Sequence, residues 1–145
     1  MVTKPGSEKP KEAEKAIIST GKRKRAIARA HFRHGTGKLR VNSKPIETSF
    51  GIIESMKIRE PLMLAGGDFS GYDIEIVARG GGPMGQANAI RLAIAKGIAG
   101  INPELKKRFL EYDRNMLVAD ERRTEPRKPP RSSKGARRYK QRSKR

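Results

Sequence analysis

Closely spaced basic side chains are the residues of this sequence with the clearest chemistry. They form one consecutive cluster and one run at every second position: Lys22, Arg23, Lys24 and Arg25, then Arg29, His31 and Arg33. Lysine and arginine both bind phosphate, and arginine does so through two parallel hydrogen bonds. The whole chain carries a formal net charge of +19 over 145 residues. We therefore expect a polyanionic partner.

The end of the chain holds more of the excess charge than any other part. Residues 121–145 contain 12 basic and 2 acidic residues, against 14 and 10 in residues 26–120 and 8 and 3 in residues 1–25. With so few apolar side chains, this end cannot bury enough surface to offset an ordering cost of ~1–2 kcal/mol per residue. We expect an extended basic arm over 119–145 that is disordered alone and ordered on a partner. A solubilising tail is the alternative.

The chain contains few of the residue types and arrangements that a catalytic site requires. The chain has no Cys, which excludes disulfides, a cysteine nucleophile and thiolate zinc sites, and its two His offer little for a metal. Two close carboxylate pairs, Glu111 with Asp113 and Asp120 with Glu121, lie beside arginines and are expected to form ion pairs. We predict a protein that is not an enzyme and that holds no metal and no cofactor.

The start of the chain predicts no export and no membrane insertion. Residues 1–15 are rich in Lys, Glu and Pro, lack the apolar region of a secretory signal, and are expected to form a flexible basic leader. Uncharged runs stay well short of the ~18 apolar residues that a membrane span requires. A cytoplasmic protein is expected.

Alternating residues predict two neighbouring strands near the start of a globular domain over 16–118. Residues 26–33 and 38–42 alternate apolar with basic or polar side chains, and a His-Gly-Thr-Gly turn separates them. A hairpin would place Phe32 opposite Leu39 and Ala30 opposite Val41. On the other face the predicted pairs are Arg33 with Lys38, His31 with Arg40, and Arg29 with Asn42. Like charges opposite one another destabilise a sheet, so we expect this face to bind phosphate, with an ordinary solvated face as the alternative.

The rest of the domain predicts helices that cover one face of this sheet. Thr48 or Ser49 is expected to cap a short helix that Pro61 breaks or restarts. Residues 72–78 alternate cleanly as a strand, residues 86–101 carry a helical apolar stripe, and a last helix from about residue 103 buries Leu105, Phe109 and Tyr112. Strands and helices in this order predict an α/β (α+β) two-layer sandwich.

A glycine-rich loop joins the strand at 72–78 to the next helix. Gly80-x-Gly82-x-x-Gly85 fits the dinucleotide fingerprint, but no strand with an acidic residue follows about 20 positions on. Glycines also permit positive φ and close approach of a strand and a helix. A third reading is that the loop amides at Gly81 and Gly82 hold an RNA phosphate, helped by Arg79 and Arg91. These alternatives stay open on the sequence alone.

Three stretches resemble the universal small-subunit ribosomal protein family numbered nine (S-nine). The run over 80–98, Gly-Gly-Gly-Pro-Met-Gly-Gln-Ala-Asn-Ala-Ile-Arg-Leu-Ala-Ile-Ala-Lys-Gly-Ile, is similar to the family signature throughout. Gly-Lys-Arg-Lys-Arg-Ala-Ile-Ala-Arg-Ala over 21–30 resembles its first strand motif, and Ser-Lys-Arg over 143–145 resembles its C-terminus. The resemblance covers residues 16–145, and segments near residues 71–76 and 112–123 are similar to the archaeal branch.

The resemblance implies a fold, a place and partners. The fold is a mixed sheet covered by helices on one face, like the second domain of ribosomal protein S-five, with a left-handed crossover that runs against the general rule. The place is the head of the small ribosomal subunit in the cytoplasm, where the protein is a monomer beside neighbouring head proteins. The partners are small-subunit rRNA and the anticodon stem-loop of P-site tRNA.

The resemblance also assigns residues to these partners. Contact with tRNA falls to the C-terminal tip: Ser143, Lys144 and Arg145. Contact with rRNA extends along the arm behind it: Arg131, Lys134, Arg137, Arg138, Tyr139, Lys140 and Arg142. The residue pattern itself adds positions of the domain that are expected to contact rRNA, basic side chains and two loop glycines: Lys22, Arg23, Lys24, Arg25, Arg29, His31, Arg33, Lys38, Arg40, Arg79, Gly81, Gly82 and Arg91. The alternative from a different class is a free basic nucleic-acid chaperone or chromatin-type protein.

Overall fold

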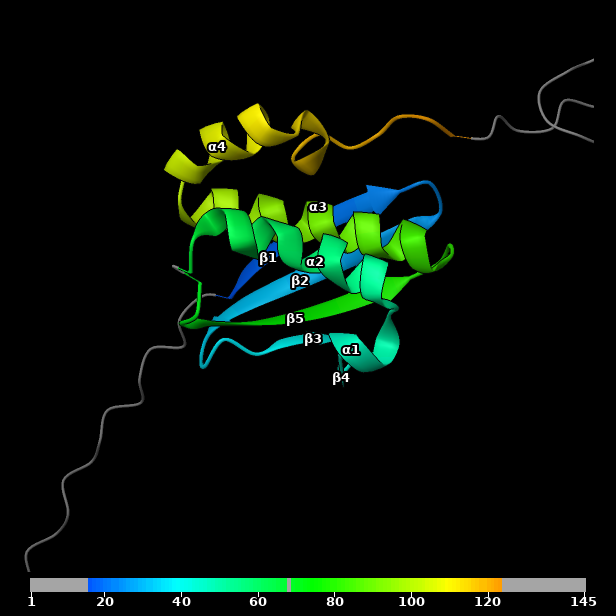
Figure 1. Ribbon diagram of the computed structural model, residues 1–145, viewed down its shortest axis with the longest axis horizontal. Coiled ribbons are helices and arrows are strands. Elements are labelled where there is room, and N and C mark those ends of the chain that lie inside the picture. Colours follow the sequence, from blue (N-terminus) through cyan, green and yellow to red (C-terminus); the bar gives the residue numbers. More distant parts are fainter. Residues whose placement is uncertain (1–15, 68, 124–145) are drawn as a thin grey trace, which may run out of the picture.

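A computed structural model describes residues 16–67 and 69–123 (Figure 1). These residues form one five-stranded sheet with the strand order β1-β2-β5-β3-β4. The strands are β1 (Ile17–Arg23), β2 (Ala26–His34), β3 (Leu39–Val41), β4 (Lys44–Pro45) and β5 (Tyr72–Arg79). The helices are α1 (Ile46–Ser49), α2 (Ile52–Ala65), α3 (Pro83–Ile101), α4 (Glu104–Tyr112) and the short 3-10 helix η1 (Arg114–Met116).

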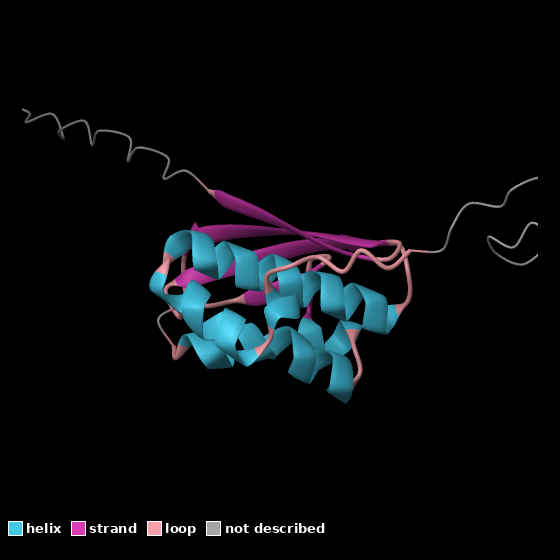
Figure 2. Ribbon diagram, turned by 90° about the horizontal axis from the view of Figure 1, so that it is seen from above, coloured by secondary structure: helices cyan, strands magenta, loops and turns pink. Residues whose placement is uncertain are grey.

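The two layers are a sheet and a set of helices on one of its faces, as the sequence predicts. Seen from above, the helices lie together on one side of the strands and the other side of the sheet is open (Figure 2). α3 packs against β1 and β2, and α2 packs against α3. No helix within the described ranges is long and apolar enough to cross a bilayer.

The sheet is mixed, because a crossover brings β5 back between two earlier strands. β5 pairs antiparallel with β2 and parallel with β3. The chain passes from β3 through α1 and α2, which lie in front of the sheet in Figure 1, and returns to β5. Viewed with the strands pointing upwards and the helices in front, β5 lies to the left of β3, so the crossover is left-handed as expected (Figure 1).

The predicted hairpin between residues 26–33 and 38–42 is wrong. β2 and β3 are not neighbours, because β5 lies between them. Each predicted pair that the strand register covers is nevertheless in one row across the sheet: Phe32 and Leu39 both lie opposite Ile74, Ala30 and Val41 both lie opposite Ile76, and His31 and Arg40 both lie opposite Glu75. The apolar alternation identified the inward face correctly, but it carries no information about which strand lies next to which.

Close contact between α3 and the sheet depends on small residues. A β-carbon on Gly21 of β1 would lie 2.0 Å from the carbonyl oxygen of Ala89, and one on Gly97 would lie 2.1 Å from the ring of Phe32. The predicted inward residues of β2 and α3 are buried there, with Ala26, Ala28, Ala30 and Phe32 facing the helix layer. This confirms that the helix lies close against the sheet.

Three expectations about the helices are wrong. Pro61 does not break a helix but lies fully buried inside α2, so the apolar packing of its ring offsets the hydrogen bond that it cannot donate. Thr48 and Ser49 belong to α1, and Gly51 precedes α2 instead. In α4, Leu105 and Phe109 are buried as predicted, whereas Tyr112 is 58% exposed.

Candidate nucleic-acid interface

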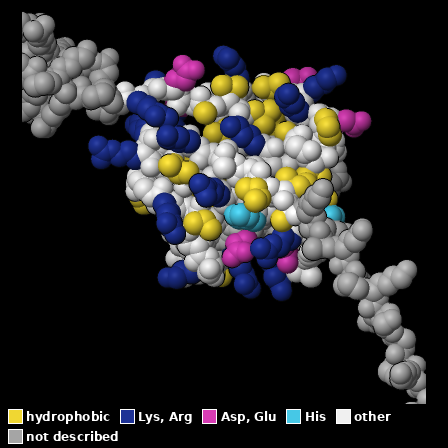
Figure 3. Space-filling view, turned by 180° about the vertical axis from the view of Figure 1, so that it is seen from behind, with side chains coloured by type: hydrophobic (Ala, Val, Ile, Leu, Met, Phe, Trp, Pro, Cys, Tyr) yellow, Lys and Arg dark blue, Asp and Glu magenta, His cyan; other side chains and the backbone are white. Residues whose placement is uncertain are grey.

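The open face of the sheet displays the alternate side chains of β1, β2, β3 and β5 that point away from the helices. Seen from behind, Lys and Arg side chains spread over this face, and acidic and histidine side chains gather near its lower edge (Figure 3). The strand register divides it into two parts. The turn half contains Lys22, Ile27, Arg29, Val77 and Arg79, next to the turn between β1 and β2. The loop half contains His31, Arg33, Lys38, Arg40, Asp73 and Glu75, next to the loop after β2.

The turn half has cations without acids. Lys22 lies opposite Ile27, which lies opposite Arg79, and Arg29 lies between Thr20 and Val77. Within the described ranges, none of these three cations has a hydrogen bond or an ion pair from its side chain. Ile27 and Val77 are 46% and 39% exposed, so apolar surface alternates with the basic groups. This arrangement suits contact with phosphates on either side of a sugar or base.

The loop half carries its own counter-charges, which the sequence interpretation missed. Asp73 lies opposite Arg33, and Glu75 lies between His31 and Arg40. The expected phosphate-binding face was argued from residues 26–42, which contain no acid, but β5 brings two acids into the middle of this face. The alternation over residues 72–78 already places both acids on the outward face. Only the strand order shows that this face lies between β2 and β3.

Asp73 also fixes the loop that crosses the end of β5. Its Oδ1 accepts hydrogen bonds from the backbone N–H of Thr36 at 2.8 Å and of Lys38 at 2.9 Å. Both hydrogen bonds lower the pKa of Asp73, because they favour the charged carboxylate, and the bond from the Lys38 amide has the larger effect. A β-carbon on Gly35 would overlap this carboxyl group at 2.2 Å. Asp73 is therefore a structural anchor as well as a counter-charge.

The glycine loop lies beside the turn half and is shaped by backbone geometry. Gly80 and Gly81 have φ angles of 75° and 69°, which side chains with a β-carbon rarely adopt. A β-carbon on Gly80 would lie 2.6 Å from the carbonyl oxygen of Arg25, so the loop packs directly on the turn between β1 and β2. Gly82 then precedes Pro83, the first residue of α3. Arg79, at the end of β5, completes a basic rim next to the exposed amides.

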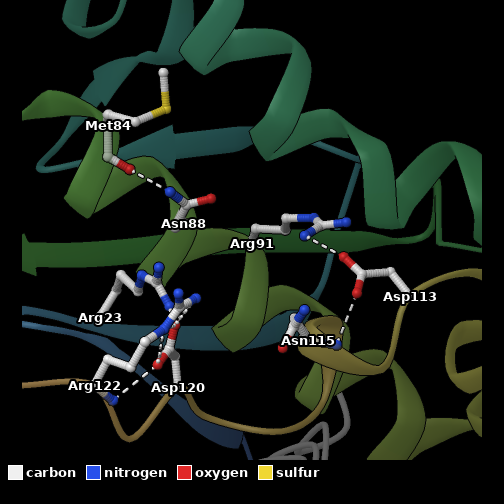
Figure 4. Close-up of polar contacts among 8 residues, drawn as sticks. All are labelled: Arg23, Met84, Asn88, Arg91, Asp113, Asn115, Asp120 and Arg122. Atoms are coloured by element: carbon white, nitrogen blue, oxygen red, sulfur yellow. Dashed lines mark hydrogen bonds and ion pairs between the residues drawn. The ribbon is translucent and has the colours of Figure 1, made fainter.

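The structure does not bring Arg91 to this loop, although the sequence analysis grouped them. Arg91 lies nine residues after Gly82, about 13 Å along the helix axis at 1.5 Å per residue. Its guanidinium pairs instead with Glu60 of α2 at 2.6 Å and with Asp113 at 2.9 Å, and only 14% of its side chain is exposed (Figure 4). Arg91 therefore joins α2, α3 and the segment after α4.

One carboxylate of each predicted pair is used in ion pairs, whereas Glu111 and Glu121 form none within the described ranges. Asp113 pairs with Arg91, and Asp120 contacts both Arg23 and Arg122 (Figure 4). Burial disfavours the charged form of Asp113, but the backbone N–H of Asn115 and the guanidinium of Arg91 outweigh it and lower its pKa. Within the described ranges, no group of three or more His, Cys, Asp or Glu residues is placed to hold a metal ion.

The residues predicted in the arm lie outside the described residues. These are Arg131, Lys134, Arg137, Arg138, Tyr139, Lys140 and Arg142, together with Ser143, Lys144 and Arg145. The described chain approaches that part at the end of the sheet that carries the turn between β1 and β2 and the glycine loop (Figure 1). The root of the arm and the turn half of the open face therefore lie at the same end of the domain.

Known proteins similar to this chain agree on one family. A family model described as ribosomal protein S9/S16 matches residues 21–145. The small ribosomal subunit protein uS9 of Methanococcus maripaludis strain C7 is 47% identical over 131 residues, covering 89% of this chain and 98% of that protein. The proteins of the same name from Methanococcus vannielii and Methanothrix thermoacetophila are 45% identical over 131 residues and 44% identical over 116 residues.

These matches confirm the resemblance and its archaeal character. The family model covers well over half of the chain, and the first relative is matched along nearly its whole length. The fold agrees with the sandwich that the resemblance implies. The chain therefore belongs to the ribosomal protein S9 family, whose members are structural, non-enzymatic constituents of the small ribosomal subunit.

Proposed function

We propose that this protein binds small-subunit rRNA with the turn half of its open sheet face and the adjoining glycine loop. The observation that carries the proposal is a group of three cations without acidic neighbours: Arg29, Arg79 and Lys22 face outwards, and no acid lies opposite any of them on the neighbouring strands. Like charges that are held together on a rigid sheet raise the electrostatic free energy of the unbound protein, and RNA phosphates relieve it.

The surroundings of this row favour RNA over free solvent. Exposed Ile27 and Val77 lie between the cations, and such apolar side chains pack against ribose or an unstacked base. Lys24 and Arg25 extend the basic surface around the turn, and the amides at Gly81 and Gly82 lie beside them. Contacts of these kinds fix the position of an RNA backbone with little reading of base sequence.

The arm is proposed to continue this surface and to end on tRNA. Its rRNA contacts would come from the basic residues and Tyr139 within 131–142, and the tip over 143–145 would touch the anticodon stem-loop of P-site tRNA. The support is the charge of the last 25 residues, 12 basic against 2 acidic, and the end of the domain at which the described chain leaves, which is also the end that carries the turn half (Figure 1). Lys144 and Arg145 can contact phosphates in any tRNA.

In the cell, the proposal places the protein as a monomer in the head of the cytoplasmic small subunit, next to other head proteins. A free nucleic-acid chaperone is the competing function. Co-sedimentation with small subunits through a high-salt sucrose gradient separates the two. Incorporation predicts that the protein stays with the subunits, whereas its release from every ribosomal fraction at moderate salt would favour the chaperone.

Deletion of residues 143–145 tests the tip. Subunit assembly should be unchanged, and P-site tRNA binding should weaken by about 1–2 kcal/mol for two lost phosphate contacts. The matched control is Lys106→Gln with Lys107→Gln, which removes two charges from an exposed face of α4 and should leave tRNA affinity unchanged. Equal tRNA affinity in the truncated and full-length proteins would contradict the role of the tip.

A further inference from the structure

A pocket lies on the helical side of the domain, and of the turn-half residues it shares only Lys22. It lies where the segment after α4 passes along α3 towards the end of β1, and its volume is about 230 Å³. Figure 4 shows several of its side chains converging from these elements. β1, α2, α3 and the segment over 113–122 all contribute to its wall. The pocket is thus built by parts of the chain that are far apart in the sequence.

Cations outnumber acids in this wall. Five basic residues line the pocket: Lys22, Arg23, Lys57, Arg91 and Arg122. Two carboxylates, Asp113 and Asp120, line it with them. Even when Glu60 behind Arg91 is included, the basic residues exceed the acids by two. Five cations around one hollow therefore remain incompletely neutralised.

The two carboxylates orient guanidinium groups more than they neutralise the pocket. Asp120 is shared between Arg23 and Arg122, and its side chain is only 10% exposed. Arg122 binds it through Nε and Nη2 at 3.1 and 2.9 Å. One carboxylate that serves two guanidiniums leaves one positive charge over, and it holds both groups in fixed positions.

Lys57 supplies the observation that points to a ligand. It is the one lysine in the described ranges whose side chain is not exposed. Within those ranges it has no hydrogen bond and no ion pair. An ammonium that is partly withdrawn from water loses hydration, and this loss is unfavourable unless an anion replaces the lost water.

We propose that this pocket binds a single phosphate group, held by Lys57 and Lys22 and flanked by the fixed guanidiniums. A phosphate accepts hydrogen bonds from several ammonium and guanidinium donors at once. The phosphate belongs either to an RNA backbone or to a free phosphate anion, and the pocket chemistry is the same for both. The inference does not rest on the proposed RNA contacts of the sheet, because binding of inorganic phosphate to the pocket can be measured without RNA.

Binding of inorganic phosphate to the full chain tests the pocket. Nuclear magnetic resonance signals of the Arg91 Nε–H and of the Asn115 side-chain amide, which also lines the pocket, should shift in a saturable manner. Lys57→Gln should weaken phosphate binding about tenfold, as expected for a charge-assisted hydrogen bond. The control Lys96→Gln removes the same charge from an exposed position of α3 outside the pocket and should change affinity less than twofold.

The source of the phosphate follows from a second titration with a short RNA duplex that lacks terminal phosphates. If RNA shifts the pocket signals and Lys57→Gln reduces this effect, the backbone is the source. If only inorganic phosphate shifts them, a free anion is the source. Should Lys57→Gln fail to fold, Lys22→Gln on the exposed edge strand β1 repeats the test with inorganic phosphate alone, because Lys22 also belongs to the turn half proposed to bind rRNA. Absence of saturable shifts with both probes, or equal losses in Lys57→Gln and Lys96→Gln, would overturn the proposal.

Discussion

The turn half and the loop half of the open sheet face have similar numbers of basic residues but opposite electrostatic arrangements. In the turn half, Arg29 faces Thr20 and Val77 across the neighbouring strands, whereas in the loop half Arg40 faces Glu75. The difference comes entirely from β5, which presents acids at one end and Val77 and Arg79 at the other. A count of basic residues along β2 therefore does not locate a nucleic-acid surface, because the adjacent strand decides which cations have an acid as a cross-strand neighbour.

The comparison makes charge reversal the strongest test. Arg29→Glu combined with Arg79→Glu should lower affinity for small-subunit rRNA by about 100-fold, since two phosphate contacts are lost and two repulsions are added. The matched reversal in the loop half, Arg33→Glu with Arg40→Glu, should lower it only a few-fold. Filter binding at fixed salt measures both.

The same measurement has a built-in control, since the two double variants change the net charge equally. Equal losses of rRNA affinity would mean that overall charge and not the turn half determines binding. A larger loss from the loop-half variant would reverse the assignment of the two halves.

Removal of one acid, Glu75, should make the loop half bind rRNA more like the turn half. Glu75→Gln removes the negative charge that lies between Arg40 and His31, and we expect rRNA affinity to rise about threefold to tenfold, with a steeper dependence on salt. Glu111→Gln, at an exposed position of α4, is the control and should leave both quantities nearly unchanged. If Glu75→Gln behaves like this control, the acids of β5 do not limit binding.

The smallest effect is expected from Asp73, which fixes the loop after β2, and it concerns the stability of the protein and not its RNA affinity. The pKa of Asp73 is lowered by backbone hydrogen bonds from Lys38 and Thr36, so its contribution to stability is present above its unfolded pKa of about 4 and is lost as pH falls through the folded value. Asp73→Asn should lower the thermal midpoint slightly at neutral pH and flatten the decline of stability below about pH 4. Circular dichroism melts over pH 2–7 measure this. An acid limb identical to that of the original chain would show that Asp73 does not fix the loop.

The elements could be predicted from the sequence because their signals are local. The alternation over 72–78 and the apolar stripe of α3 are properties of consecutive residues, and both agree with the structure. Pro61 predicted a helix break that the structure does not have. It stays inside α2 because its ring is buried by contacts from elsewhere in the fold. Helix propensity is a weak guide where tertiary packing decides.

The neighbours of the strands could not be predicted in the same way. Phe32 and Leu39 were expected to be adjacent, and they lie in one row with Ile74 between them. A hairpin and a crossover place the same residues on the inward face, so the apolar pattern does not distinguish them. The two halves of the candidate interface depend on this choice. The separation of Arg91 from the glycine loop has another cause, its distance along α3, where it pairs with Glu60 and Asp113.

The most direct test of the division into two halves is a map of RNA crosslinks on the assembled small subunit. Ultraviolet crosslinking followed by mass spectrometry of the peptides identifies the protein residues that touch rRNA. We expect crosslinks from the domain to concentrate in residues 22–29 and 77–82 and to be sparse in residues 33–40 and 73–75. Crosslinks concentrated in the second set, with none in the first, would contradict the account.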